Sequence, residues 1–239
     1  MRRAAGVLLL AAATATACSG GTVHTSPTSL PPTTLTSTPI SPPGVADTAR
    51  QWVAALAAKQ EGPAYAVMAP GSQAVVGGQS KFAAVASGLE RQWGGWATNA
   101  LAEFDAVPVT DGLAVVIMHA ETKEHELIGA ALPMRVVGGE WRPDPLETAG
   151  SFRFDPVDRS RLAPEAAIAV DVESGVRTDA FVDQRIAVAP PPKATSGTTQ
   201  RVSFKPQRPF ENGWHLVTLV LRKGDAVSAV TARYQVAPK

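Results

Sequence analysis

Asn212-Gly213-Trp214-His215-Leu216-Val217-Thr218-Leu219-Val220-Leu221 is the stretch on which the fold of the C-terminal part of the chain depends. Lys223-Gly224-Asp225 and a second β-prone run at 226–236 follow it. Two such runs separated by a short turn that contains glycine are typical of an antiparallel hairpin. The sequence therefore predicts strands at 214–222 and 226–236.

Further short strands are expected before this hairpin, each bounded by glycine or proline. They lie at 166–173, 185–188 and 200–204. No helix is expected after Glu165. Short strands of even spacing favour a β-sandwich, so residues 165–239 are predicted to form an all-β sandwich domain. Residues 146–164 contain prolines and mixed charges and are expected to be the junction in front of it, with Phe152 and Phe154 in a short extended segment.

The apolar pattern differs in residues 46–145. A helical spacing predicts helices from Ala46 to about Gln60, at 63–68 and at 80–93. Strands are then expected at 98–109, 113–122 and 125–137, with a short continuation at Trp141. The run 113–118 is apolar on both faces, which is typical of a central strand that is covered on both sides. Helices followed by an antiparallel sheet make an α+β layout.

The phrase Ala46-Asp47-Thr48-Ala49-Arg50-Gln51-Trp52-Val53-Ala54-Ala55-Leu56, with this order of elements, resembles the nuclear-transport-factor-2-like domain near the N-terminus of some penicillin-binding lipoproteins. The resemblance implies a cone-like, cystatin-like fold whose sheet wraps a helix-lined cavity. The Ser-x-x-Lys, Ser-x-Asn and Lys-Thr-Gly motifs of transpeptidases do not occur in the chain. We therefore expect the accessory domain without the enzyme.

The C-terminal hairpin resembles the last hairpin of bacterial immunoglobulin-like domains. That resemblance rests on the stretch quoted first and on the turn Lys223-Gly224-Asp225. It implies a fold and no particular chemistry, because immunoglobulin-like folds host unrelated functions.

The N-terminal residues 1–17 have the order of a secretory signal peptide. Arg2 and Arg3 precede an apolar stretch, and Ala15-Thr16-Ala17 supplies small residues just before Cys18. Ala-Thr-Ala-Cys resembles a bacterial lipobox, although Ala15 stands where such motifs most often have leucine. The resemblance implies a diacylated Cys18, for example with palmitate, on the outer face of the cytoplasmic membrane. The alternative is a secreted protein in which Cys18 is incidental.

Residues 18–45 are rich in threonine, serine and proline, which predicts a disordered linker behind the lipidated cysteine. Cys18 is the only cysteine, so no intramolecular disulfide is expected. The abundance of alanine and proline resembles proteins of high-GC Gram-positive bacteria.

The charge balance gives no reason to expect nucleic-acid binding. The chain has 22 basic and 21 acidic residues, whereas phosphate binding needs a concentrated basic surface. Nucleophile-elbow and phosphate-loop motifs are also absent. We therefore expect a non-catalytic binding or scaffolding module of the cell envelope. Its partners would be the bilayer, through Cys18, and another envelope protein or a small ligand; a regulatory partner of cell-wall transpeptidases is a third possibility.

One hairpin gathers the residue types of a zinc site, namely His119, Glu121, Glu124, His125 and Glu126. Glu121 and Glu126 would face each other across the turn, while His119 would lie several pairs from His125. A solvated hairpin tip explains this pattern better, so no metal and no cofactor are expected.

The rival hypothesis is a small-molecule binder or an isomerase-like enzyme that uses the cavity of the first domain. Relatives of the cone fold such as ketosteroid isomerase place an Asp base, a Tyr and an acid inside it. The possible ligand contacts here are Tyr65, Trp96, Asp105, His119 and Trp141, with Glu103 as a further acid. Trp52 and Trp93 are expected in the core, and His215 in a packed or hydrogen-bonded position.

Overall fold

Four helices form the first part of the chain in the computed structural model, which describes residues 44–95, 102–122, 127–187, 193–194 and 197–237. They are α1 (Val45–Ala57), α2 (Glu61–Ala66), α3 (Pro70–Val76) and α4 (Gln79–Trp93). In α1 the residues Ala49, Trp52, Val53 and Leu56 are buried, as their helical spacing predicts. Cys18, Trp96, the hairpin tip with Glu124, His125 and Glu126, and the predicted signal peptide and linker (1–43) lie outside the described residues.

The helix α3 was not expected from the sequence, because Pro70-Gly71 was interpreted as the end of a helix. The structure instead has Pro70 at the first helical turn, after Ala69 in an extended conformation. Proline is well tolerated there, since its missing N–H would have no partner inside the helix. Pro70 therefore starts a helix.

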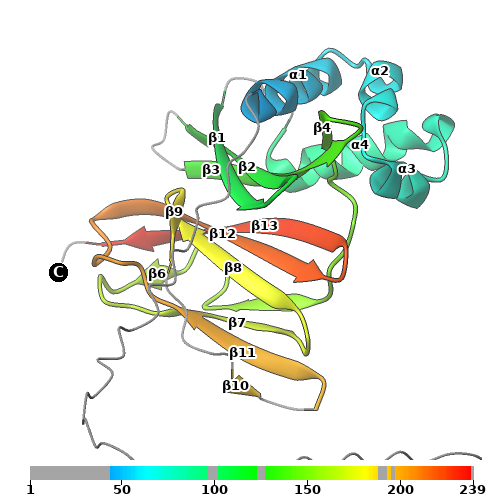
Figure 1. Ribbon diagram of the computed structural model, residues 1–239. Helices are drawn as coiled ribbons and strands as arrows, with labels where there is room; N and C mark the ends of the chain where they lie inside the picture. The colour runs from blue at the N-terminus through cyan, green and yellow to red at the C-terminus, as the bar shows by residue number, and fades with distance from the viewer. Residues whose placement is uncertain (1–43, 96–101, 123–126, 188–192, 195–196, 238–239) are drawn as a thin grey trace, which may run out of the picture. The chain divides into compact units, whose positions relative to one another are not determined.

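An antiparallel sheet follows the helices (Figure 1). Its order is β1-β2-β3-β4, and its strands are β1 (Glu103–Thr110), β2 (Leu113–Glu121), β3 (Leu127–Val137) and β4 (Glu140–Pro143). Gly112, with φ of 71°, lies in the tight turn between β1 and β2. This left-handed conformation favours glycine.

The central strand β2 is buried on both faces, as its apolar run predicts. On one face Ala114, Val116 and Met118 pack against the helices. They belong to a core with Trp52, Leu56, Met68, Phe82, Leu89, Trp93, Leu132, Met134 and Trp141. On the other face Val115 and Ile117 pack against Phe181, Leu216, Val220 and Val227 from the strands that follow. The sheet β1–β4 therefore lies between two hydrophobic layers.

The C-terminal residues form two further sheets that pack face to face (Figure 1). One has the order β10-β11-β7-β5 and contains β5 (Phe152–Asp155), β7 (Ile168–Glu173), β10 (Lys193–Ala194) and β11 (Thr199–Phe204). The other has the order β6-β13-β12-β8-β9 and contains β6 (Arg161–Leu162), β8 (Arg177–Val182), β9 (Arg185–Ile186), β12 (Gly213–Lys223) and β13 (Ala226–Val236). The predicted hairpin is β12–β13, paired from Gly213↔Val236 to Lys223↔Ala226.

The sandwich core draws side chains from both sheets. Val170, Val172 and Phe204 meet Leu219, Leu221 and Tyr234 there. The strand β8 was not expected, because Arg177, Thr178 and Asp179 interrupt its apolar pattern. Asp179 accepts a hydrogen bond from Arg222 of β12 at 2.7 Å, so this polar residue is matched by a cross-strand partner.

The segment that was expected to be a junction contributes strands to both sheets. β5 pairs with β7, and β6 pairs with β13 in parallel. The described residues from Gly44 onward accordingly belong to one compact unit. None of the helices among the described residues combines the length and apolar character required to cross a membrane.

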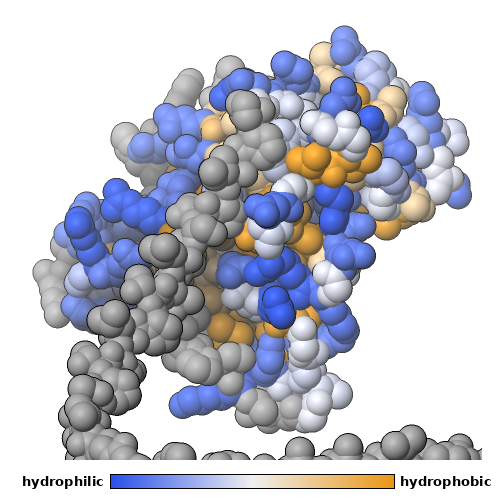
Figure 2. All heavy atoms as spheres, viewed as in Figure 1, coloured by the Kyte–Doolittle hydropathy of each residue, from blue (hydrophilic) through white to orange (hydrophobic). Residues whose placement is uncertain are grey.

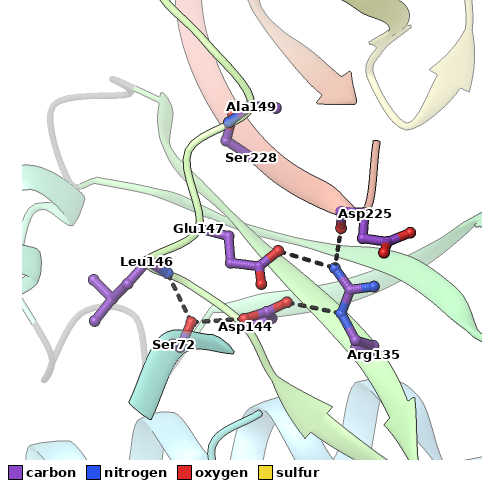
Figure 3. Close-up of polar contacts among 8 residues, drawn as sticks. All are labelled: Ser72, Arg135, Asp144, Leu146, Glu147, Ala149, Asp225 and Ser228. Atoms are coloured by element: carbon purple, nitrogen blue, oxygen red, sulfur yellow. Dashed lines mark hydrogen bonds and ion pairs between the residues drawn. The ribbon is translucent and has the colours of Figure 1, made fainter. Parts of the chain in front are cut away.

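A buried polar network lies where the first sheet meets the sandwich (Figure 3). Ser72 of α3 donates a hydrogen bond to Asp144 Oδ1 at 2.7 Å and accepts one from the Leu146 N–H at 3.0 Å. Ser72 and Asp144 are both fully buried. Because these groups satisfy one another, they fix α3 to the chain that leaves β4.

Arg135 of β3 completes this network (Figure 3). Its Nε donates to Asp144 Oδ2 at 3.0 Å, and its Nη2 donates to Glu147 at 3.1 Å. Nη2 also donates to the backbone carbonyl of Asp225, in the turn between β12 and β13, at 2.6 Å. One guanidinium thus joins the first sheet to the sandwich.

Candidate binding pocket

The helix-facing side of the first sheet, where a ligand cavity was expected, is occupied by packed side chains. Trp141 is 8% exposed and belongs to this core. Tyr65 packs on Phe82 with ring centroids 5.7 Å apart, and its hydroxyl donates a long hydrogen bond of 3.5 Å to the Gln73 carbonyl. Both side chains therefore take part in packing.

Asp105 and His119 lie on the opposite face of the same sheet from Tyr65 and Trp141. Val115, Ile117 and His119 are every second residue of β2 and so share a face, and Val115 and Ile117 face the sandwich. His119 Nε2 is 2.7 Å from Asp105 Oδ2 and 3.8 Å from Glu103 Oε2. The structure thus brings three of the predicted residues together and separates them from the other two.

Apolar surface alone does not single out a binding site. Among the residues that the structure describes, the large exposed apolar side chains come from different segments and are Val67, Val75, Phe152, Val157 and Ile186. On the face seen in Figure 2, hydrophobic residues occur in groups between hydrophilic ones. Surfaces of this mixed kind are ordinary in proteins.

A pocket of about 480 Å³ lies at one end of the sandwich. One wall is the turn between β8 and β9, in which Asp183 and Gln184 have φ of 47° and 62°. Two consecutive left-handed residues allow a two-residue hairpin turn that follows the twist of the strands. The opposite wall is the segment from Pro206 to Glu211.

His215 of β12 lies at the base of this pocket and connects its two walls. Nδ1 is 2.7 Å from Asp183 Oδ2, and Nε2 is 2.8 Å from the Glu211 carbonyl oxygen. Phe210 packs edge-on to the imidazole with centroids 4.9 Å apart. Asp183 Oδ1 also accepts a hydrogen bond from the Leu216 N–H at 3.0 Å. The structure thus agrees with the expected hydrogen-bonded position of His215.

The pKa of His215 is raised above its ordinary value of 6.5. Burial acts in the opposite direction, because it disfavours the charged ring. The hydrogen bonds to Asp183 and to the Glu211 carbonyl outweigh burial, since both acceptors are best satisfied when each ring nitrogen carries a proton. The imidazole therefore links the two walls through contacts at both ring nitrogens.

Two arginine side chains make the pocket suitable for an acidic ligand. Arg185 and Arg208 line it and are exposed, and within the described part of the chain their side chains have no ion-pair or hydrogen-bond partner. Gln207 donates to the Ile186 carbonyl at 3.4 Å and so connects the two walls near their rims. Guanidinium groups in this state suit a carboxylate or another acidic group.

The sequence did not point to this pocket. Its residues come from two segments, 182–186 and 206–215, that are 20 positions apart, and no motif relates them. The prolines at 206 and 209 and the turn Asp183-Gln184 were the available signals, and each by itself indicates only a loop.

Comparisons with known proteins yield no family for the chain. No protein-family model matches it, and no curated protein matches it. Among solved structures, a chain described as titin Ig tandem domains A164-A165 is similar, with 12% sequence identity and a TM-score of 0.25. The match covers 57% of this chain and 74% of that chain.

Proposed function

We propose that this protein is a lipid-anchored, extracytoplasmic module that binds another component of the cell envelope and does not catalyse a reaction. The pocket between the β8–β9 turn and the segment 206–211 carries this proposal. Its arginines are available to an acidic group, whereas both nitrogens of His215 already have hydrogen-bond acceptors. A histidine in that state is not placed to take a proton from a substrate, so these groups favour binding.

The anchor in this proposal is the lipobox-like Ala-Thr-Ala-Cys, with two acyl chains on Cys18. Two chains are what stable attachment to a bilayer needs. The linker 18–45 would then hold the folded residues at a distance from the outer face of the cytoplasmic membrane.

The fold assignment in this proposal is a nuclear-transport-factor-2-like domain at 46–145 and an immunoglobulin-like domain at 165–239. The helices in front of an antiparallel sheet support the first, and the two packed sheets with the β12–β13 hairpin support the second. Both folds serve many functions, so the binding role depends on the pocket.

The alternative is a small-molecule binder or isomerase-like enzyme in the first domain. It needs Tyr65, Asp105 and His119 around one cavity. Tyr65 packs against Phe82 on the helix side, while Asp105 and His119 lie on the other face of the sheet. This separation favours the pocket of the sandwich over the first domain.

Photo-crosslinking in intact cells tests the proposal. A photo-reactive residue is placed at Ile186, which is 59% exposed beside the pocket, and in a matched chain at Val75, which is 62% exposed on α3. We expect a discrete adduct from position 186 that is lost when Arg185 and Arg208 are both changed to alanine. The same adduct from position 75, or an adduct that does not depend on the arginines, would contradict the proposal that this pocket is the binding site.

Membrane fractionation tests the anchor separately. We expect Cys18→Ser to release the protein from the membrane fraction. If the variant stays in that fraction, the lipid anchor is wrong, whatever the crosslinking gives.

A further inference from the structure

Three potential metal ligands converge at one end of the first sheet. Glu103 and Asp105 are two residues apart on β1, so their side chains emerge from the same face. Glu103 pairs directly with His119 of β2. One ligand atom from each residue lies within 4.8 Å of the other two. We propose that Glu103, Asp105 and His119 form a binding site for a divalent transition-metal ion such as Zn²⁺.

The spacing of the ligand atoms suits such an ion. Four-coordinate zinc with bonds of about 2.0–2.2 Å requires ligand atoms separated by roughly 3.4 Å. The observed separations from His119 Nε2, 2.7 Å to Asp105 and 3.8 Å to Glu103, lie on either side of that value. Small rotations of exposed carboxylates would therefore complete the site.

The protein alone leaves this cluster electrostatically incomplete. A single ring nitrogen faces two carboxylates, and it can donate only one proton. It hydrogen-bonds to Asp105, while 3.8 Å is too long for a hydrogen bond to Glu103. A divalent cation can interact with both carboxylates at once, which a proton on this nitrogen cannot do.

The donor set selects the kind of ion. One imidazole nitrogen with two carboxylate oxygens suits Zn²⁺ and its first-row neighbours, whereas Ca²⁺ and Mg²⁺ prefer oxygen ligands only. The side chain of His119 is 19% exposed, and those of Asp105 and Glu103 are 49% and 83% exposed. The remaining coordination positions would therefore be open to water or to a ligand atom from a partner.

The sheet beneath the cluster is rigidly held. His119 pairs with Gly129 of β3, and Leu216 of the sandwich packs over that glycine. Ile117, the next residue of β2 on this face, is fully buried. The imidazole therefore projects from a fixed strand, which reduces the entropy cost of binding an ion.

This inference is independent of the proposed pocket, and it differs from the expectation that no metal is bound. The zinc-like pattern in the sequence joins His119 to residues of its own hairpin, whereas Asp105 and Glu103 were expected with His119 as contacts of a cavity. Glu103 and Asp105 come from the preceding strand.

The pair His215–Asp183 provides a matched control within the same chain. It has the same nitrogen-to-carboxylate distance of 2.7 Å, but the other ring nitrogen is hydrogen-bonded to a backbone carbonyl. Among the described residues, no second carboxylate oxygen lies close enough to complete a group of three metal ligands around His215. If a His–Asp pair were enough to bind Zn²⁺, both this pair and His119–Asp105 would bind an ion.

The experiment is a titration of the chelator-treated, full-length protein with Zn²⁺ by isothermal titration calorimetry. We expect one ion per chain, and a loss of affinity of about tenfold or more in His119→Gln and in Asp105→Asn. His215→Gln should bind like the unaltered protein. Circular dichroism of each variant checks that it is folded.

Co²⁺ in place of Zn²⁺ gives a second readout, because its visible absorption reports a nitrogen and oxygen coordination shell that His119→Gln should alter. The proposal is overturned if no binding is detected, or if His119→Gln binds unchanged. It is also overturned if His215→Gln loses as much affinity as His119→Gln, or if His125→Gln abolishes binding while His119→Gln retains it.

Discussion

Leu216 of β12 occupies the space into which any side chain on Gly129 of β3 would project. A Cβ on Gly129 would lie 2.4 Å from Leu216 Cδ1 and 3.1 Å from its Cγ. The Thr231 hydroxyl donates to the Gly129 carbonyl at 2.9 Å, so the strand is also held by a hydrogen bond. The first sheet and the sandwich therefore approach closely because residue 129 has no side chain.

Gly129→Ala should destabilise the protein by about 1–3 kcal/mol, since Leu216 is 1% exposed and has little room to move. Urea denaturation measures the change. Gly88→Ala in α4 is the matched control, because nothing lies within 4 Å of its Cβ position. Alanine is a better helix former than glycine, so this control should be unchanged or more stable by up to about 1 kcal/mol. Equal losses in both variants would be evidence against the close approach.

Arg135→Met should destabilise the protein by about 3 kcal/mol. Asp144 is fully buried and would keep only the hydroxyl of Ser72 as a partner, which leaves its charge largely uncompensated. Denaturation midpoints in urea would report the loss.

The control for this variant is Glu90→Gln, which removes the ion pair between Glu90 and Lys59 at 3.5 Å. The Lys59 side chain is 66% exposed, so we expect a change within about 0.5 kcal/mol. A comparable change in the two variants would argue against a structural role for the network around Arg135.

Trp52→Phe should cost about 1–3 kcal/mol. The indole Nε1 donates a hydrogen bond of 3.0 Å to the Ala64 carbonyl in a buried position, and phenylalanine would leave that carbonyl without this donor. Thermal or urea denaturation would measure the loss. Val75→Ser, at a position that is 62% exposed, should change stability by no more than about 0.5 kcal/mol. A cost for Trp52→Phe as small as that of Val75→Ser would show that this bond contributes little.

His215 should make stability depend on pH in a defined direction. Its pKa in the folded protein is above 6.5, so the folded state binds a proton more tightly than the unfolded state. The resulting stabilisation is present below about pH 6.5 and is lost as the pH rises through the higher folded pKa.

Melting temperatures of the unaltered protein and of His215→Gln, compared between about pH 5 and pH 9, check this prediction. The advantage of the unaltered protein should shrink as the pH rises. Asp183→Asn should weaken the dependence, because it removes the carboxylate that faces Nδ1. An advantage that grows with pH would contradict the raised pKa of His215.

Much of the fold follows from hydrophobic pattern. The run 113–118 predicted a strand covered on both faces, and β2 is such a strand. The hairpin at 212–236 was likewise confirmed in its strands and turn. Two elements that this pattern did not predict are α3 and β8. Pro70 is tolerated in α3 because it lies in the first turn of the helix, and Asp179 is accommodated in β8 because Arg222 of β12 donates a hydrogen bond to it.

The sequence grouped Glu103, Asp105 and His119 as contacts of a cavity, but it did not predict that their side chains meet as potential metal ligands, for a geometric reason. A regular hairpin with Thr110 opposite Leu113 would place Phe104 opposite His119, and Glu103 and Asp105 on the other face. The register shifts between Pro108 and Thr110, so that Glu103 faces His119 instead. One extra residue in a strand moves the side chains beyond it to the opposite face of the sheet, and the amino-acid pattern does not indicate such a shift.

The pocket could not be predicted from the sequence for a different reason. Asp183 and His215 are 32 positions apart, and only the pairing of β8 with β12 brings them together. Neither residue has a neighbour in the sequence that would mark it as part of a site.

The strand β13 follows all the other described strands in the chain, yet it is an inner strand of its sheet, between β6 and β12. Its residues Val227 and Ala229 also belong to the layer that packs against the first sheet. A nascent chain therefore cannot complete the core of the sandwich, or the layer between the sandwich and the first sheet, until β13 has emerged. Until then β12, with five fully or nearly fully buried apolar residues, lacks a partner along one edge and would be the segment most in need of a chaperone.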